Sequence, residues 1–112
     1  MTLDENSNGQ IVEAPIGDTL EIRLPENPTT GFRWHLTSDG SPACSLVRDD
    51  FSAPSNPPPG KGGMHTWRFE AVRAGECNIE LRSRRRWEAS TERERTFTIH
   101  VSVRNQSGGL RP

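Results

Sequence analysis

Apolar and polar residues alternate along most of this chain, and no segment keeps a helical period over the length that a stable helix needs. In residues 19–24, Leu20, Ile22 and Leu24 alternate with charged or polar residues. Successive side chains of a strand point to opposite faces of a sheet, so this pattern predicts a strand with one buried face. Similar runs predict further strands at residues 10–14, 32–37, 44–51, 64–71, 77–82 and 97–103.

Short strands separated by turns, with no internal repeat, predict an all-β protein, an immunoglobulin-like β-sandwich of about seven strands. The 112 residues suggest one domain, and because only 30% of them are hydrophobic, its core must be thin. We expect this domain at residues 10–104, with flexible tails at residues 1–9 and 105–112. Trp34 precedes both cysteines, so the antibody-type disulfide is not expected.

The charge balance and the N-terminus narrow the function classes. A formal net charge of −1 argues against a general preference for nucleic acid or for anionic membranes. No stretch resembles a transmembrane span, and the acidic, polar N-terminus does not resemble a secretory signal. The expected location is therefore the cytoplasm, or the periplasm or exterior if a signal has been removed. We expect a monomer.

Cysteines and histidines do not form a convincing catalytic or metal-binding set. Cys44 and Cys77 lie in strand-like runs, which favours two small buried residues; a disulfide across the core is the alternative and needs an oxidising compartment. His35, His65 and His100 lack metal-ligand spacing, so no metal or other cofactor is expected. The sequence leaves a Cys–His nucleophile open, but reactive thiols prefer exposed, electropositive sites. We therefore expect no enzyme.

Three long connections are the natural place to look for function. If consecutive strands run up and down, alternate connections lie at the same end of the sandwich. Residues 25–31, 52–63 and 83–95 are such alternate connections, so we expect them to cluster. Unusual loops grouped on a rigid scaffold commonly carry binding sites.

The first connection is stiff. Pro25 and Pro28 fix φ, Thr29 and Thr30 are β-branched, and Gly31 can take positive φ. A loop with few conformations to lose suits insertion into a preformed slot, because binding then costs less ordering entropy. A turn in which proline and glycine serve geometry alone is the simpler reading.

The other two connections carry a glycine-rich segment and an exposed aromatic. Residues Gly60 to Gly63 leave room for a partner backbone, and a strand rather than a helix follows them, which argues against a phosphate cradle. Trp87 stands among charges beside Arg85, a combination typical of protein-binding hot spots. The alternatives are that Trp87 packs on the sandwich edge or stacks on a nucleic-acid base. Nearby glutamates weaken the nucleic-acid reading.

The order of these motifs resembles the chagasin family of cysteine-peptidase inhibitors. That family has an Asn-Pro-Thr-Thr-Gly-aromatic loop, a Gly-x-Gly-Gly loop and an Arg-Pro-Trp/Phe loop on an immunoglobulin-like fold. The first motif is complete here from Asn27 to Phe32, and the second is complete from Gly60 to Gly63. The third departs from the family, because Arg86 stands between Arg85 and Trp87 where the family has proline.

The resemblance implies a reversible inhibitor of papain-like (clan CA) cysteine peptidases, whose loops plug the active-site cleft. The residues that it assigns to peptidase binding are Asn27, Pro28, Thr29, Thr30, Gly31, Phe32, Gly60, Lys61, Gly62, Gly63, Arg85 and Trp87. The alternative is an immunoglobulin-like adhesion or recognition module that uses the same loops for a different ligand.

Overall fold

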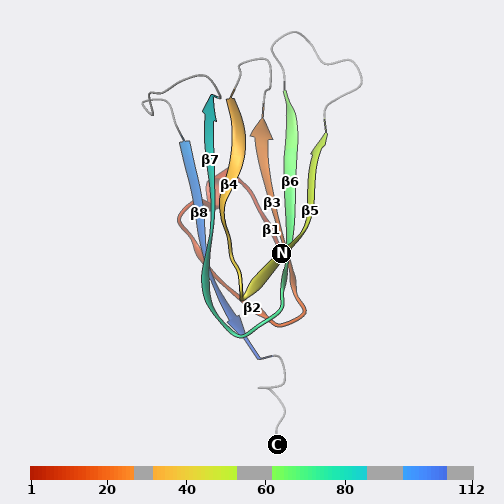
Figure 1. Ribbon diagram of the computed structural model, residues 1–112, viewed down its shortest axis with the longest axis vertical. Coiled ribbons are helices and arrows are strands. Elements are labelled where there is room, and N and C mark those ends of the chain that lie inside the picture. Colours follow the sequence, from red (N-terminus) through yellow and green to blue (C-terminus); the bar gives the residue numbers. More distant parts are fainter. Residues whose placement is uncertain (27–31, 53–61, 86–94, 106–112) are drawn as a thin grey trace, which may run out of the picture.

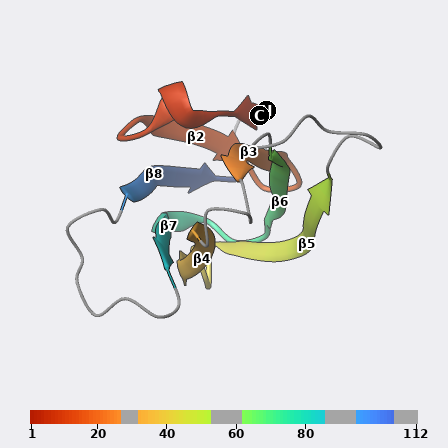
Figure 2. The same ribbon diagram turned by 90° about the horizontal axis from the view of Figure 1, so that it is seen from above.

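The computed structural model describes residues 1–26, 32–52, 62–85 and 95–105. Its strands are β1 (Thr2–Leu3), β2 (Ile11–Pro15), β3 (Thr19–Glu26), β4 (Phe32–Asp39), β5 (Cys44–Ser52), β6 (Gly63–Ala71), β7 (Gly75–Arg85) and β8 (Arg95–Arg104). One sheet has the order β1-β3-β6-β5 and the other β2-β8-β7-β4, and the two form a sandwich (Figures 1 and 2). This confirms the predicted β-sandwich, with eight strands in the described part rather than about seven.

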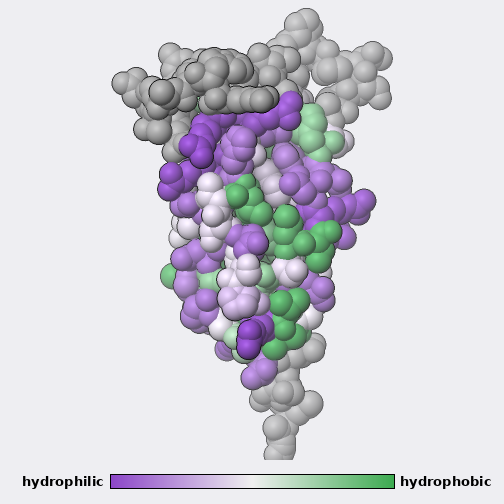
Figure 3. All heavy atoms as spheres, viewed as in Figure 1, coloured by the Kyte–Doolittle hydropathy of each residue, from purple (hydrophilic) through white to green (hydrophobic). Residues whose placement is uncertain are grey.

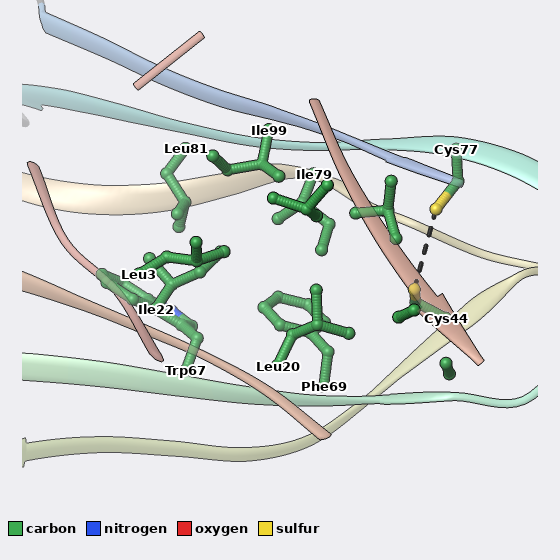
Figure 4. Packing of buried hydrophobic residues seen from close by; sticks show 14 of the residues in the cluster. Leu3, Leu20, Ile22, Cys44, Trp67, Phe69, Cys77, Ile79, Leu81 and Ile99 are labelled. Atoms are coloured by element: carbon green, nitrogen blue, oxygen red, sulfur yellow. Dashed lines mark hydrogen bonds between the residues drawn. The ribbon is translucent and has the colours of Figure 1, made fainter. Parts of the chain in front are cut away.

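Inward-facing residues of the alternating runs form the core. In the first sheet Leu20 lies opposite Phe69, and Ile22 lies opposite Trp67; all four side chains are buried. In the second sheet Ile79 pairs with Ile99 in the same way. Figure 4 shows these side chains filling the space between the sheets. Burial of both inner faces explains why a chain with so few apolar residues forms one continuous core.

Several strands are longer than the alternation predicts, and β3 and β7 extend furthest toward the loops. β3 continues through Pro25 to Glu26, and β7 continues through Ser83 to Arg85, so both extend into segments predicted as connections. Pro25 has no N–H to donate, yet it remains in register opposite Met64. Ser83 is buried and lies opposite Trp34 of β4. Cross-strand pairing therefore extends the sandwich further than side-chain hydropathy alone indicates.

The N-terminal segment differs from the predicted flexible tail. β1 pairs in parallel with β3, placing Leu3 opposite Ile22, and Leu3 is 5% exposed and belongs to the core. The short 3-10 helix η1 (Glu5–Ser7) follows, and the Asp4 side chain caps it. Two strand residues are too few to show alternation, which is why the sequence pattern missed this strand.

The two cysteines are free and buried, as the favoured prediction held. Cys44 of β5 and Cys77 of β7 place their sulfur atoms 3.7 Å apart between the sheets (Figure 4). Burial, with a smaller contribution from Cys77, raises the pKa of the Cys44 thiol to about 12. Burial also raises the pKa of Cys77. Both side chains are therefore neutral thiols at physiological pH and poor nucleophiles.

Candidate functional site

The six strand ends that flank the three long connections meet at one end of the sandwich, which we call the loop pole. In the first sheet, Glu26 at the end of β3 lies opposite Gly63 at the start of β6. In the second, Phe32 at the start of β4 lies opposite Arg85 at the end of β7. The ends of β5 and β8 that face the undescribed segments lie at the same pole (Figure 1). Up-and-down strand order therefore brings the strand ends that flank all three connections to one pole, as the predicted arrangement requires.

Several of the predicted site residues lie outside the described residues. They are Asn27, Pro28, Thr29, Thr30, Gly31, Gly60, Lys61 and Trp87. Of the remainder, Phe32 is half-buried at the start of β4, and Gly62 and Gly63 are half-buried where β6 begins. The backbone of Arg85 ends β7. Each of the three motifs thus has at least one described member, and these members lie together at the loop pole.

A buried carboxylate lies directly below the first motif. Leu20, Ile22 and Leu24 face inward along β3, and the same alternation places Glu26 inward, where it is 5% exposed. Its Oε2 atom accepts a hydrogen bond of 2.7 Å from the backbone N–H of Trp34. Because β4 is an edge strand of its sheet, this N–H needs a partner from outside the sheet.

The second oxygen of Glu26 faces His65 of β6. Glu26 Oε1 lies 2.9 Å from His65 Nδ1, and His65 Nε2 contacts the Asp49 carboxylate of β5. The imidazole stacks on Trp67, with ring centroids 3.9 Å apart and 7° between the planes, and Phe51 meets its edge. The apolar core therefore ends at this pole in a polar cluster that joins β3, β4, β5 and β6.

A second hydrogen bond joins the two sheets beside Glu26. The indole Nε1–H of Trp34 donates to the carbonyl of Pro25 at 3.0 Å. The guanidinium carbon of Arg95, at the start of β8, lies 5.3 Å from the Trp34 ring centroid, in range of a cation–π contact. Trp34, which follows the first connection, thus contacts the two residues that precede it, Pro25 and Glu26, and the beginning of β8.

Glu26 and His65 were not among the predicted site residues, although the sequence contains a signal for both. Glu26 continues the inward parity of Leu20, Ile22 and Leu24, and His65 shares the parity of Trp67 and Phe69. A charged or titratable residue at an inward position needs a partner, so two such positions on adjacent strands suggest a pair. The partnership with the Trp34 N–H has no signal in the sequence.

The described residues offer no obvious catalytic or metal centre. Among them, no group of three or more His, Cys, Asp or Glu side chains could hold a metal ion. Within the same ranges no helix has the length and apolarity needed to cross a bilayer. His35 is exposed on β4, and His100 of β8 contacts Glu76 and Asn78.

Comparison with known proteins shows which class of protein this chain belongs to. Amoebiasin-1 of Entamoeba histolytica is 33% identical over 107 residues, which cover 92% of this chain and 99% of that protein. Chagasin of Trypanosoma cruzi is 30% identical over 100 residues, covering 86% of this chain and 91% of that one. The cysteine protease inhibitor EhICP2 of E. histolytica has a similar solved structure, with TM-score 0.80, 26% identity and coverage of 92% and 94%.

The sandwich and these relatives together define the class of the chain, a protein inhibitor of peptidases. Residues 13–101 match the model of the Chagasin family peptidase inhibitor I42, and the chain belongs to this family. The resemblance seen in the three sequence motifs is thereby confirmed. The roles of individual loop residues remain predictions.

Proposed function

We propose that this protein is a reversible, non-covalent inhibitor of papain-like cysteine peptidases that plugs the active-site cleft with the three connections of its loop pole. The observation that carries the proposal is the meeting of the six flanking strand ends at one pole. Family membership supports the class of partner, and EhICP2, itself a cysteine protease inhibitor, supports it further. The family assignment does not favour an adhesion module.

In this proposal the first connection blocks the catalytic centre. Thr29, Thr30 and Gly31 would lie across the catalytic Cys–His pair, with the Thr30 hydroxyl and backbone groups contacting that region. The connection begins and ends on a scaffold with hydrogen bonds from Trp34 to both Pro25 and Glu26. A segment anchored on both sides resists the distortion that nucleophilic attack requires, so occupancy need not lead to cleavage.

The other two connections would bind on either side of the catalytic centre. Residues Gly60 to Gly63 would follow the substrate groove and form backbone hydrogen bonds, since glycine leaves the backbone accessible. Trp87 would pack on an aromatic surface, and Arg85 would reach acidic or carbonyl groups at the rim. Large aromatics beside arginine are typical of the residues that contribute most to binding energy.

A titration against papain and cathepsin L tests the proposal. We expect tight, competitive inhibition that is weakened by Thr30→Ala and by Trp87→Ala. Truncation of a central anchor such as Trp87 should cost about 2 kcal/mol or more, roughly a 30-fold weaker inhibition constant. Thr19→Ala is the matched control for Thr30→Ala, because Thr19 is an exposed threonine at the opposite end of β3. A folded sample that shows no inhibition at micromolar concentration would contradict the proposal.

A further inference from the structure

We infer that Glu26, held by His65, is a positioning residue for inhibition: it fixes the two ends from which residues 27–31 are presented to a peptidase. The inference deepens the proposed function and rests on it. Glu26 directly precedes the first motif. Trp34 lies two residues after Phe32, the last residue of that motif. The hydrogen bond between Glu26 and the Trp34 N–H therefore closes the base of this connection from one sheet to the other.

The chemistry of the contact explains why a carboxylate is suited to this place. Glu26 is 5% exposed, so a short polar or apolar residue here would leave the edge N–H of Trp34 without its acceptor in a region closed to water. A carboxylate has two oxygens and can serve two partners at once. One oxygen binds the Trp34 N–H at 2.7 Å, and the other lies 2.9 Å from His65 Nδ1.

His65 extends this base to the second motif. It lies on β6 two residues after Gly63, and Gly63 itself is opposite Glu26 in the register. Its ring is fixed by the stack on Trp67 and by Asp49 on the far side. The charged groups that contact the ring are Glu26 from β3 and Asp49 from β5. The cluster therefore sets the relative placement of the strand ends that carry the first and second motifs.

The test separates positioning from stability. Glu26→Ala removes both contacts, whereas Glu26→Gln keeps a carbonyl oxygen for the Trp34 N–H and an amide that can donate to an unprotonated His65 Nδ1. Val103→Ala is the matched control, because Val103 is a buried β8 residue near the opposite end. Val101→Ala offers a second core truncation to match the loss of thermal stability.

Inhibition constants for papain and cathepsin L are measured well below every unfolding midpoint. We expect Glu26→Ala to weaken inhibition about 10- to 100-fold, with Glu26→Gln restoring it to within about 3-fold of the unaltered chain. A valine variant whose unfolding midpoint matches that of Glu26→Ala should keep an inhibition constant within about 2-fold of the unaltered chain. In the free proteins, the Trp34 backbone amide should be protected from hydrogen exchange in the unaltered chain and in Glu26→Gln, and lose that protection in Glu26→Ala.

The outcomes distinguish failure of the positioning role from failure of the proposed function. If the unaltered chain inhibits and Glu26→Ala weakens inhibition no more than the valine variants, the positioning role is wrong and the proposed function stands. Equal loss in Glu26→Gln and Glu26→Ala would also overturn it, because the acceptor for Trp34 would not be what matters. If the folded, unaltered chain inhibits neither peptidase, the proposed function fails and the positioning role fails with it.

Discussion

Gly40, in the turn between β4 and β5, is fixed as glycine by both its backbone and its surroundings. Its φ is +80°, in the left-handed region that residues with a Cβ rarely adopt. A Cβ there would lie 3.0 Å from Cys44 Cβ and 3.1 Å from Ile79 Cγ1. Neither neighbour can move easily, since Cys44 and Ile79 are both buried in the core.

We therefore expect Gly40→Ala to lower the free energy of unfolding by about 3 kcal/mol, the sum of backbone strain and overpacking. Gly17→Ala is the matched control: its φ is +100°, but no atom lies within 4 Å of its added Cβ, so the cost should be about 1–2 kcal/mol. Urea unfolding of both variants measures the difference. Equal losses would show that the neighbours of Gly40 adapt without cost.

The Cys44 thiol makes stability depend on alkaline pH. Its pKa in the folded protein is about 12, against an ordinary value of 9.0. Below pH 9 both folded and unfolded chains keep the proton, so the thiol adds no pH dependence. Between about pH 9 and 12 the unfolded chain releases its proton first. The free energy of unfolding therefore falls as pH rises, by about 1.4 kcal/mol per unit from this group.

Cys44→Ala removes this contribution. In urea unfolding at pH 8, 9.5 and 10.5, the stability difference between the unaltered chain and Cys44→Ala should shift steadily in favour of the variant as pH rises. Two curves that stay parallel over this range would show that the folded thiol titrates normally.

At the scale of single residues, the sequence predicts side-chain direction better than partnership. The parity of Leu20 and Ile22 correctly indicated which side chains of β3 are buried, because a strand has a fixed period. The same parity applies to Glu26, but its partners come from β4 and β6, and a single sequence does not state how those strands are registered. The sequence therefore contains a signal for the burial of Glu26 but none for its hydrogen bonds.

Among the strands of the described residues, β1 is the one that the sequence pattern missed. It adds a parallel edge to the first sheet, and its backbone pairs Leu3 with Ile22. The N-terminal amino group also donates to the carbonyl of Thr19 at 3.1 Å. A strand of two residues is too short to show an alternating pattern in the sequence, so it becomes visible only in the structure, through its pairing with β3 and the burial of Leu3.

Leu3→Ala tests whether β1 contributes to folding stability. Because Leu3 is 5% exposed in the core, the variant should lose about 2–3 kcal/mol of unfolding free energy. Ile11→Ala is the control, since Ile11 is 75% exposed and its truncation should change stability by no more than about 0.5 kcal/mol. If both variants change the free energy of urea unfolding equally and only slightly, β1 does not contribute to stability and the prediction of a flexible N-terminal tail stands.

The seven longer strands were predicted in place, and most of them have several alternating pairs; β5, whose residues after Cys44 are mostly exposed, is the exception. Their ends were predicted less well: β7 runs to Arg85, beyond the last apolar residue of its pattern, Leu81. Pairing with β4 continues there through backbone hydrogen bonds, which every residue except proline can donate and accept whatever its side chain.

Over the whole molecule, the outer face of the second sheet changes charge toward the loop pole. Along β7 the outward residues run from Glu76 through Glu80 to Arg82 and Arg84. On the neighbouring strand Arg33 lies directly opposite Arg84. On the side of the molecule seen in Figure 3, hydrophilic side chains gather toward the loop pole and apolar ones lie further from it. Arg82 also lies 3.4 Å from the Glu80 carboxylate. The positive charge of Arg33, which is exposed at this end, is the one whose effect on a charged partner can be tested.

Electrostatic attraction across an interface acts mainly on the rate of association. With a papain-like peptidase whose cleft is rimmed by acidic groups, Arg33→Glu should slow association about 3- to 10-fold at low ionic strength and leave dissociation nearly unchanged. The effect should shrink above about 0.3 M salt, where screening acts within a few ångströms. Stopped-flow measurement of peptidase inhibition over a salt series gives both rates.

Arg73→Glu is the control for this charge reversal. Arg73 is exposed in the turn between β6 and β7, at the end of the sandwich opposite the loop pole, and the variant has the same net charge as Arg33→Glu. If net charge alone governs encounter, the two variants will slow association equally. If the peptidase approaches the loop pole, Arg33→Glu will slow association more than Arg73→Glu does, because a charge at the far end lies much farther from the contact and interacts with it more weakly.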